Sequence, residues 1–156
     1  MKNLITAVAT AFVLYAPVAV SAMDHSAMNH SEHSMEDKNL SAHEETIDGV
    51  KAVFNVRTMA DAMQAMGMSM PKGMKETHHI SVFFVDLKSG KKIADGAVMV
   101  KVQNPDESYN TKELVAMQGH FGSDFELSKK GKYGVMCKFQ LKDGKTRQAK
   151  FWYTVK

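Results

Sequence analysis

The chain has 156 residues, a formal net charge of +3 at pH 7, and one cysteine beside 13 methionines and 7 histidines. A charge this close to balance argues against a large basic surface for nucleic acid or anionic lipid. The single cysteine excludes an internal disulfide. The length suits one domain with a short additional segment.

Residues 1–22 have the pattern of a secretory signal peptide. Lys2 provides the positive start, Leu4–Tyr15 is an apolar run, and Val20-Ser21-Ala22 is a small-residue cleavage site. No later stretch is long and apolar enough to span a bilayer. We therefore expect a soluble exported protein, most simply a bacterial periplasmic one, with no stable insertion in the membrane.

The segment Met23–Glu45 has few bulky apolar side chains to bury, so we predict that it is disordered without metal. Histidine and methionine recur in it at short spacing: His25, Met28, His30, His33 and Met35. Short tracts of this kind bind metals. The alternative is a polar leader that only separates the domain from the membrane.

Two pieces of this segment, His25-Ser26-Ala27-Met28 and His33-Ser34-Met35, resemble the Met/His repeats of bacterial copper-resistance proteins. The resemblance implies that the segment takes up copper. If cleavage follows Ala22, the new amine and the third-residue imidazole of His25 can also hold Cu(II) in a square plane, a geometry that this ion favours.

Residues 46–156 alternate apolar and polar side chains between turn signals such as Asn104-Pro105-Asp106 and Lys142-Asp143-Gly144-Lys145. About seven short antiparallel strands in a domain of this size predict an all-β fold, an immunoglobulin-like antiparallel β-sandwich. The predicted strands are Val50–Val56, His78–Leu87, Val98–Val102, Thr111–Met117, His120–Leu127, Tyr133–Leu141 and Arg147–Val155.

An exported sandwich of this size is similar in architecture and setting to the copper-binding CopC-type proteins and their small periplasmic relatives. The resemblance implies a copper-binding function. The chain departs from that family at its expected mature start, where Met23 stands in place of a histidine.

A methionine-rich insertion, Met59–His79, separates the first two predicted strands. Thr58 and Asp61 form a capping-box pattern, and Met59, Met63 and Met66 then recur on one face of a short helix that Gly67 would end. Helical periodicity does not explain the remaining three, Met68, Met70 and Met74. Thioethers select Cu(I), whereas the alternative is that methionine fills gaps in a core.

Further candidate ligands lie on the predicted strands. His78 and His79 point to opposite faces, and Met117 and His120 flank a Gly-containing turn. Met99 and Met136 fall on polar faces of two strands that pair in an immunoglobulin-like sandwich, so we expect them to be neighbours. Cys137 alternates inward and is expected to be a buried, inert thiol.

Together these patterns predict a periplasmic copper-binding protein, a carrier or buffer that holds Cu(I), and Cu(II) at its N-terminal segment. The partner would be another exported copper protein that donates or accepts the ion. An interaction module with a methionine-rich docking surface is the alternative, and reversible scavenging of oxidants is a third reading. No catalytic pattern is present. The predicted ligands are His25, Met28, His30, His33, Met35, Met68, Met70, Met74, His78, His79, Met99, Met117, His120 and Met136.

Overall fold

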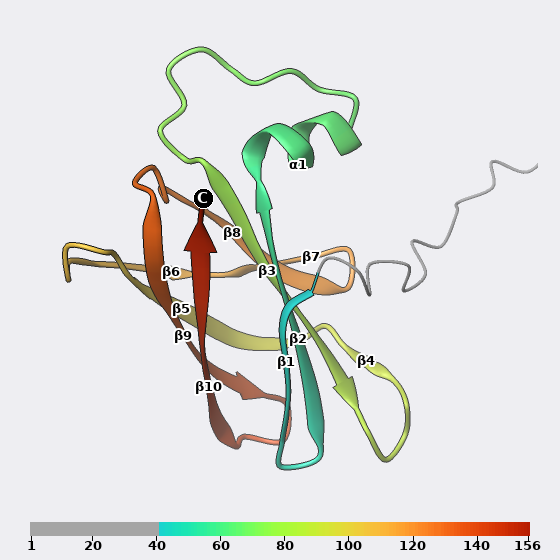
Figure 1. Cartoon of the computed structure of the whole chain (residues 1–156). Coiled ribbons are helices and arrows are strands. Elements are labelled where there is room, and N and C mark those ends of the chain that lie inside the picture. The colour runs from blue at the N-terminus through green and yellow to red at the C-terminus, as the bar shows by residue number, and fades with distance from the viewer. Residues whose placement is uncertain (1–40) are drawn as a thin grey trace, which may run out of the picture. The chain divides into compact units, whose positions relative to one another are not determined.

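The computed structural model describes residues 41–156, which form ten strands and one short helix in two antiparallel sheets (Figure 1). The first sheet has the order β1-β2-β3-β8-β7, with β4 also paired to β3; the second has the order β10-β9-β5-β6. The first sheet contains β1 (Ser41–Ile47), β2 (Val50–Thr58), β3 (His78–Asp86), β4 (Lys92–Ile93), β7 (Val115–Met117) and β8 (His120–Phe125). The second contains β5 (Gly96–Gln103), β6 (Tyr109–Glu113), β9 (Gly131–Leu141) and β10 (Thr146–Val155), and α1 is Met59–Ala65.

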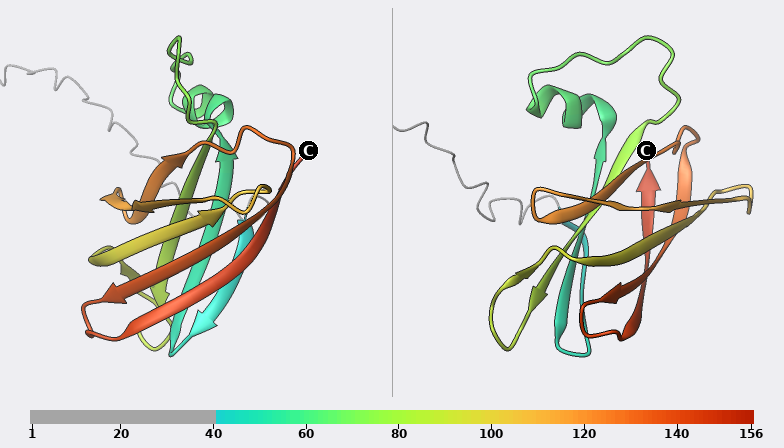
Figure 2. Two further views of the ribbon diagram at one scale, coloured as in Figure 1. Left: turned by 90° about the vertical axis from the view of Figure 1, so that its left-hand side faces the viewer. Right: turned by 180° about the vertical axis from the view of Figure 1, so that it is seen from behind.

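The two sheets pack face to face and enclose one hydrophobic core (Figure 2). Alternate residues of each strand point inward, so Phe84 and Phe54 from the first sheet meet Phe139 and Phe151 from the second, respectively. The rings of Phe84 and Phe139 lie 4.4 Å apart between centroids. The predicted all-β sandwich is therefore confirmed.

Cys137 lies on the inward face of β9, where Val135 and Phe139 are also buried. Removal from water disfavours the thiolate, and burial raises the pKa of this thiol to about 12. The expectation of an inert core cysteine agrees with this position.

The domain begins earlier than predicted. β1 starts at Ser41, so residues 41–45, which we expected to end a disordered segment, pair with β2 through a hairpin at Asp48-Gly49. The half-buried positions of β1 are polar apart from its last residue, so apolar alternation could not reveal it. His43 instead stacks on Phe151, with ring centroids 5.0 Å apart. The rest of the predicted segment and the predicted signal peptide lie outside the described residues.

The predicted strand Thr111–Met117 is in fact two strands in different sheets. β6 pairs with β5 in the second sheet, and β7 pairs with β8 in the first. Between them Leu114 is buried, and its N–H donates to the carbonyl of Val98 over 2.8 Å. The buried leucine fixes the place where the chain passes from one sheet to the other.

In the described part of the chain, no helix is long and apolar enough to cross a membrane.

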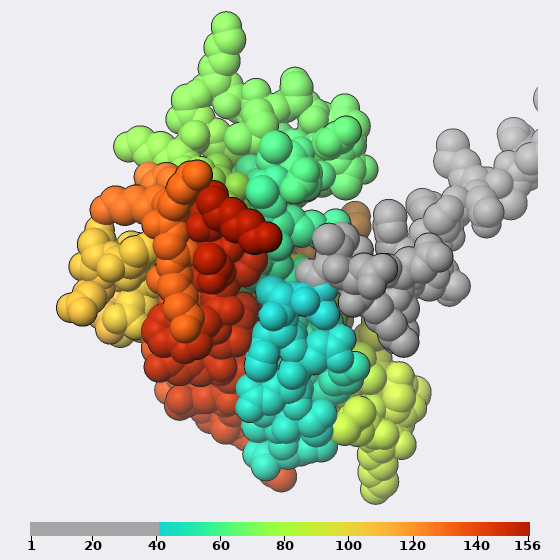
Figure 3. All heavy atoms as spheres, in the orientation of Figure 1, coloured from blue at the N-terminus to red at the C-terminus, as the bar shows by residue number. Residues whose placement is uncertain are grey.

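The methionine-rich insertion forms α1 and a loop that project from one end of the sandwich, drawn in green in Figure 3. Thr58 caps the helix as predicted, because its hydroxyl accepts the N–H of Asp61 over 3.1 Å. Gly67 follows with φ +68°, a left-handed conformation that suits glycine at a helix end. Of the predicted helical face, only Met59 is buried.

Candidate functional site

The methionine loop, Met66–Met74, carries the most exposed group of thioethers in the insertion. The side chains of Met66, Met68 and Met70 are 60%, 49% and 42% exposed, and Met74 is half-buried. The N–H groups of Met66 and Met68 both donate to the carbonyl of Met63, over 3.1 and 2.9 Å, which ties the start of the loop to the helix end. Three neighbouring thioethers therefore face solvent in place of packing into the core.

His78 and His79 point to opposite sides of the first sheet, as predicted. His78 is buried at the core end, with Nδ1 2.9 Å from the hydroxyl of Thr77 and its ring edge against Tyr153. Burial lowers the pKa of His78, while the Asp61 carboxylate acts in the opposite direction. This position makes His78 a packed histidine on the opposite face of the first sheet from His79.

His79 lies on the outer face of the first sheet, in a cluster with side chains from β7 and β8. Its Nδ1 is 2.6 Å from Oδ1 of Asp124, the residue directly opposite it on β8. Its ring is 6.4 Å from that of His120 between centroids, at an interplanar angle of 84°. His120 in turn lies 5.0 Å from the ring of Phe83. We call His79, Met117, His120, Gly122 and Asp124 the histidine cluster.

Met117 joins this cluster through the β7–β8 hairpin. It is directly opposite His120, and residues paired in this way project from the same face of a sheet. Gln118 and Gly119, with φ +43° and +84°, make the two-residue turn. The hairpin therefore places a thioether beside an imidazole, as the sequence predicted for the two residues around this turn.

His120 is half-buried in the cluster. The ring of Phe83 covers part of it. Burial lowers the pKa of His120, and the nearby charges of His79 and Arg57 lower it further. A lowered pKa favours the neutral imidazole, which is the form that binds metals.

Met99 and Met136 are neighbours on the outer face of the second sheet, as predicted from strand pairing. In the register, Met99 lies opposite Lys138 and Met136 opposite Lys101, so the two methionines are diagonal partners on one face. They line a hollow of about 540 Å³ together with Lys150. The methionine pair is thus on a different face of the domain from the histidine cluster, and the lysines around it disfavour cations.

The predicted ligands therefore occupy several places in the fold. The structure brings His79, Met117 and His120 together, and it groups Met68 and Met70 with Met66, which had been assigned to the helix. His25, Met28, His30, His33 and Met35 lie outside the described residues. Within residues 41–156, no group of three or more His, Cys, Asp or Glu side chains is placed to hold a metal ion.

Two residues of the histidine cluster were not predicted. Asp124 meets His79 only through the β3–β8 register, which links positions 45 residues apart in sequence. Gly122 matters because the His79 ring occupies the space where a side chain would stand. Both share the face of β8 with His120, but only the pairing of β3 with β8 reveals what they contact.

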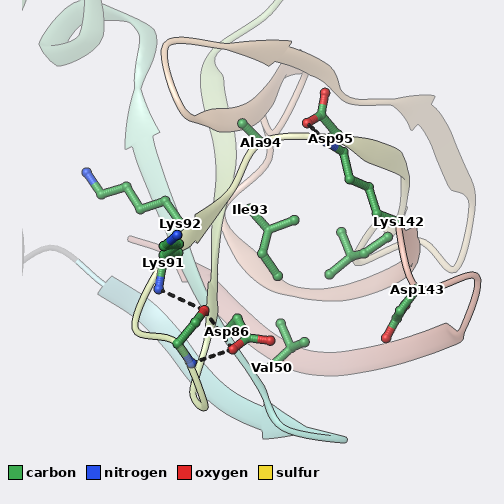
Figure 4. A pocket seen from close by; sticks show the side chains of 11 residues that line it. Val50, Asp86, Lys91, Lys92, Ile93, Ala94, Asp95, Lys142 and Asp143 are labelled. Carbon is green, nitrogen blue, oxygen red and sulfur yellow. Dashed lines mark hydrogen bonds and ion pairs between the residues drawn. The ribbon is translucent and has the colours of Figure 1, made fainter.

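A second hollow, of about 290 Å³, lies at the end of the sandwich formed by β4 and the β9–β10 turn (Figure 4). Its lining includes no methionine or histidine. Two of its acidic groups have partners: Lys142 Nζ is 2.7 Å from Asp95, and the Asp86 carboxylate accepts the N–H of Ser89 over 2.7 Å. These pairs stabilise turns, and the hollow presents no set of soft ligands.

The fold and these surfaces define the chain as an antiparallel β-sandwich domain. Its similarity to solved structures is a similarity of fold. No family model and no curated protein matches the sequence. The chain is similar to the crystal structure of a DUF4426 family protein from Pseudomonas aeruginosa PAO1, with a TM-score of 0.55 and 16% identity over 72% of this chain and 93% of that one. It also matches a Br derivative of BhCBM56 with a TM-score of 0.42 and 12% identity, over 72% and 98% of the two chains.

Proposed function

We propose that this protein binds copper in an exported compartment, most simply the periplasm, as a non-enzymatic carrier or buffer. The observation that carries the proposal is the exposure of Met66, Met68 and Met70 on one loop. Methionine that filled gaps in a core would be buried, whereas these thioethers are available to an ion from solution. Thioethers select Cu(I) over harder divalent ions.

The spacing of these methionines also suits a metal ligand set. Alternate residues in one irregular loop bring several thioethers around one ion without help from the rest of the fold. Gly67 and Gly73 both have positive φ, at +68° and +84°, and a Cβ at either would meet nothing within 4 Å. The loop is therefore open on the side of both glycines, which leaves room for an ion and for a partner that delivers or removes it.

The N-terminal segment adds His25, His30 and His33 to the same function, as a second place of uptake for Cu(I) or Cu(II). Affinity from thioethers varies little with pH because they bind without releasing protons. The histidine contribution fades as imidazole is protonated. An exposed, multidentate set of this kind favours exchange with another exported copper protein over permanent storage.

A protein-docking module is the competing function, because exposed methionines also make adaptable interaction surfaces. Substitution of Met by Leu separates the two functions. Leucine keeps the apolar character and the approximate volume of methionine but has no donor atom. A docking surface therefore survives the change, whereas a copper site does not.

The test is a Cu(I) competition titration of the mature protein against a chelator of known affinity. We expect the mature protein to compete, and we expect M66L/M68L/M70L to lose at least one equivalent of bound Cu(I). The matched control is M99L/M136L, which changes two methionines outside the loop and should leave that equivalent unchanged. Failure of the mature protein to compete would overturn the copper function and leave the docking module.

A further inference from the structure

The histidine cluster on the outer face of the first sheet has features of a metal site that the methionine loop does not supply. The first is a fixed imidazole. An ionised carboxylate only accepts hydrogen bonds, so the Asp124 oxygen, 2.6 Å from Nδ1 of His79, requires the proton to be on Nδ1. Nε2 is then the ring nitrogen that is left to bind a metal ion, which takes the place of any proton there. Carboxylates orient metal-binding histidines in this way.

The second feature is the missing side chain at Gly122, which lets both rings lie against the backbone there. A Cβ placed on Gly122 would lie 2.6 Å from Nε2 and 2.8 Å from Cε1 of His79, and 3.6 Å from Cδ2 of His120. The Nε2–Cε1 edge of His79 is therefore turned toward Gly122, and the His120 ring is the next neighbour. Any other residue at this position would push the His79 ring aside.

The third feature is the set of neighbours. Met117 lies directly opposite His120 in the hairpin, and the ring of Phe83 packs against His120 at 5.0 Å. Phe83 shields one side of the site from water, and Met117 offers a soft donor at its rim. The three strands β3, β7 and β8 thus each contribute a donor: His79, Met117 and His120 respectively.

The donor set of the cluster suits a soft ion. Imidazole is a borderline donor, and a thioether selects Cu(I) over harder divalent ions.

We propose that His79, His120 and Met117 form a second Cu(I) site, distinct from the methionine loop, in which Asp124 is a positioning residue for His79 and Gly122 provides the space. This inference rests on the proposed copper function and specifies a site within it. Formation of the site needs the β3–β8 register, so it exists only in the folded domain. The loop, by contrast, draws its donors from residues close in sequence.

The competing explanation is structural: His79 and Asp124 form a cross-strand ion pair, and His120 covers Phe83. That explanation predicts no response of either imidazole to a soft metal ion. The test uses Ag(I), a soft monovalent ion without redox chemistry, added to the full mature protein. Histidine ring ¹⁵N and methionine methyl resonances are followed by NMR.

We expect Nε2 of His79 and of His120 and the methyl group of Met117 to shift together, in the wild type and in M66L/M68L/M70L. H120N should remove the His79 and Met117 shifts. D124N should weaken Ag(I) at this site by about 10- to 100-fold, the usual effect of losing the partner of a metal-binding histidine. G122A should displace the His79 ring and weaken binding as well. The control H43N changes a histidine on β1, outside the cluster, and should have no effect.

Each outcome decides a different claim. If the mature protein binds Cu(I) but the His79 and His120 signals do not move, the second site is wrong and the copper function stands. If D124N binds like the wild type while H120N does not, Asp124 has no positioning role. If the mature protein binds neither ion, both proposals fail. The wild-type spectra decide the main question even where a variant does not fold.

Discussion

Arg147 is the most buried charged side chain of the described residues, and Asp143 is its partner at the β9–β10 turn. Its Nη1 and Nη2 donate to the two carboxylate oxygens over 3.0 and 2.5 Å. These hydrogen bonds lower the pKa of Asp143 to about 2, from an ordinary value of 3.8. A lowered carboxyl pKa means that the native state binds the proton less readily than the unfolded state.

We therefore predict that D143N lowers the free energy of unfolding at pH 7. The contribution of the carboxylate is complete above the unfolded-state pKa of 3.8 and is lost as the pH falls through about 2. The difference between wild type and D143N should shrink between pH 4 and pH 2 in urea unfolding curves. D95N is the matched control, because the Asp95–Lys142 pair is largely exposed and should contribute little. A pH-independent difference would show that the ionised carboxylate is not the cause.

Cys137 gives a second prediction for a single residue. With its pKa raised to about 12 by burial, the thiol has a very small thiolate fraction at pH 8. We expect the native protein to react with a thiol reagent more than about 1000-fold more slowly than free cysteine, whose pKa is about 8.5. Reaction should become fast in denaturant. Fast labelling of the native protein would contradict the buried position.

At the scale of elements, β1 decides where the domain begins. We predict that a chain starting at Thr46 is less stable than one starting at Leu40, because it loses most of the β1–β2 pairing and the contact of His43 with Phe151. Since each backbone hydrogen bond contributes about 1 kcal/mol, the loss should be about 2 kcal/mol or more. Thermal unfolding of the two chains measures it. Equal melting temperatures would mean that β1 is dispensable.

The elements that sequence predicted well are those whose inward face is mostly apolar. β3, β5, β9 and β10 show strict alternation of buried and polar residues or an unbroken apolar run, and the structure places them close to the predicted bounds. The cap at Thr58 and the stop at Gly67 were also predicted from local chemistry, because a cap involves neighbours only.

The elements that sequence missed depend on contacts between distant residues. β1 is stabilised by pairing and by one histidine stack, and the two-residue strand β4 exists only through its pairing with β3. The predicted strand Thr111–Met117 is divided at the buried Leu114 because its pairing with β5 in the second sheet ends at Glu113. The same limit applies to the candidate sites. Alternation along a strand gives the face on which a side chain such as His79 lies. The register of β3 and β8 was needed to show that His79 and His120 are neighbours.

For the whole molecule, the described candidate ligands form two sets that differ in how they depend on folding. The methionine loop draws Met66, Met68 and Met70 from alternate positions of one segment, so an unfolded chain offers the same donors. The histidine cluster draws its donors from three strands of the first sheet. A ligand stabilises the native state only to the extent that the unfolded state does not bind it.

This difference yields a prediction for thermal unfolding. Ag(I) at about 100 times its dissociation constant for the histidine cluster should stabilise the domain by about 2.7 kcal/mol. M66L/M68L/M70L should keep most of that stabilisation although it binds fewer ions, whereas H120N should lose most of it although its loop is intact. Melting temperatures with and without Ag(I) for the three proteins give the answer. A stabilisation that followed the loop methionines would show that the loop, and not the histidine cluster, binds the ion in a way that requires the folded sandwich.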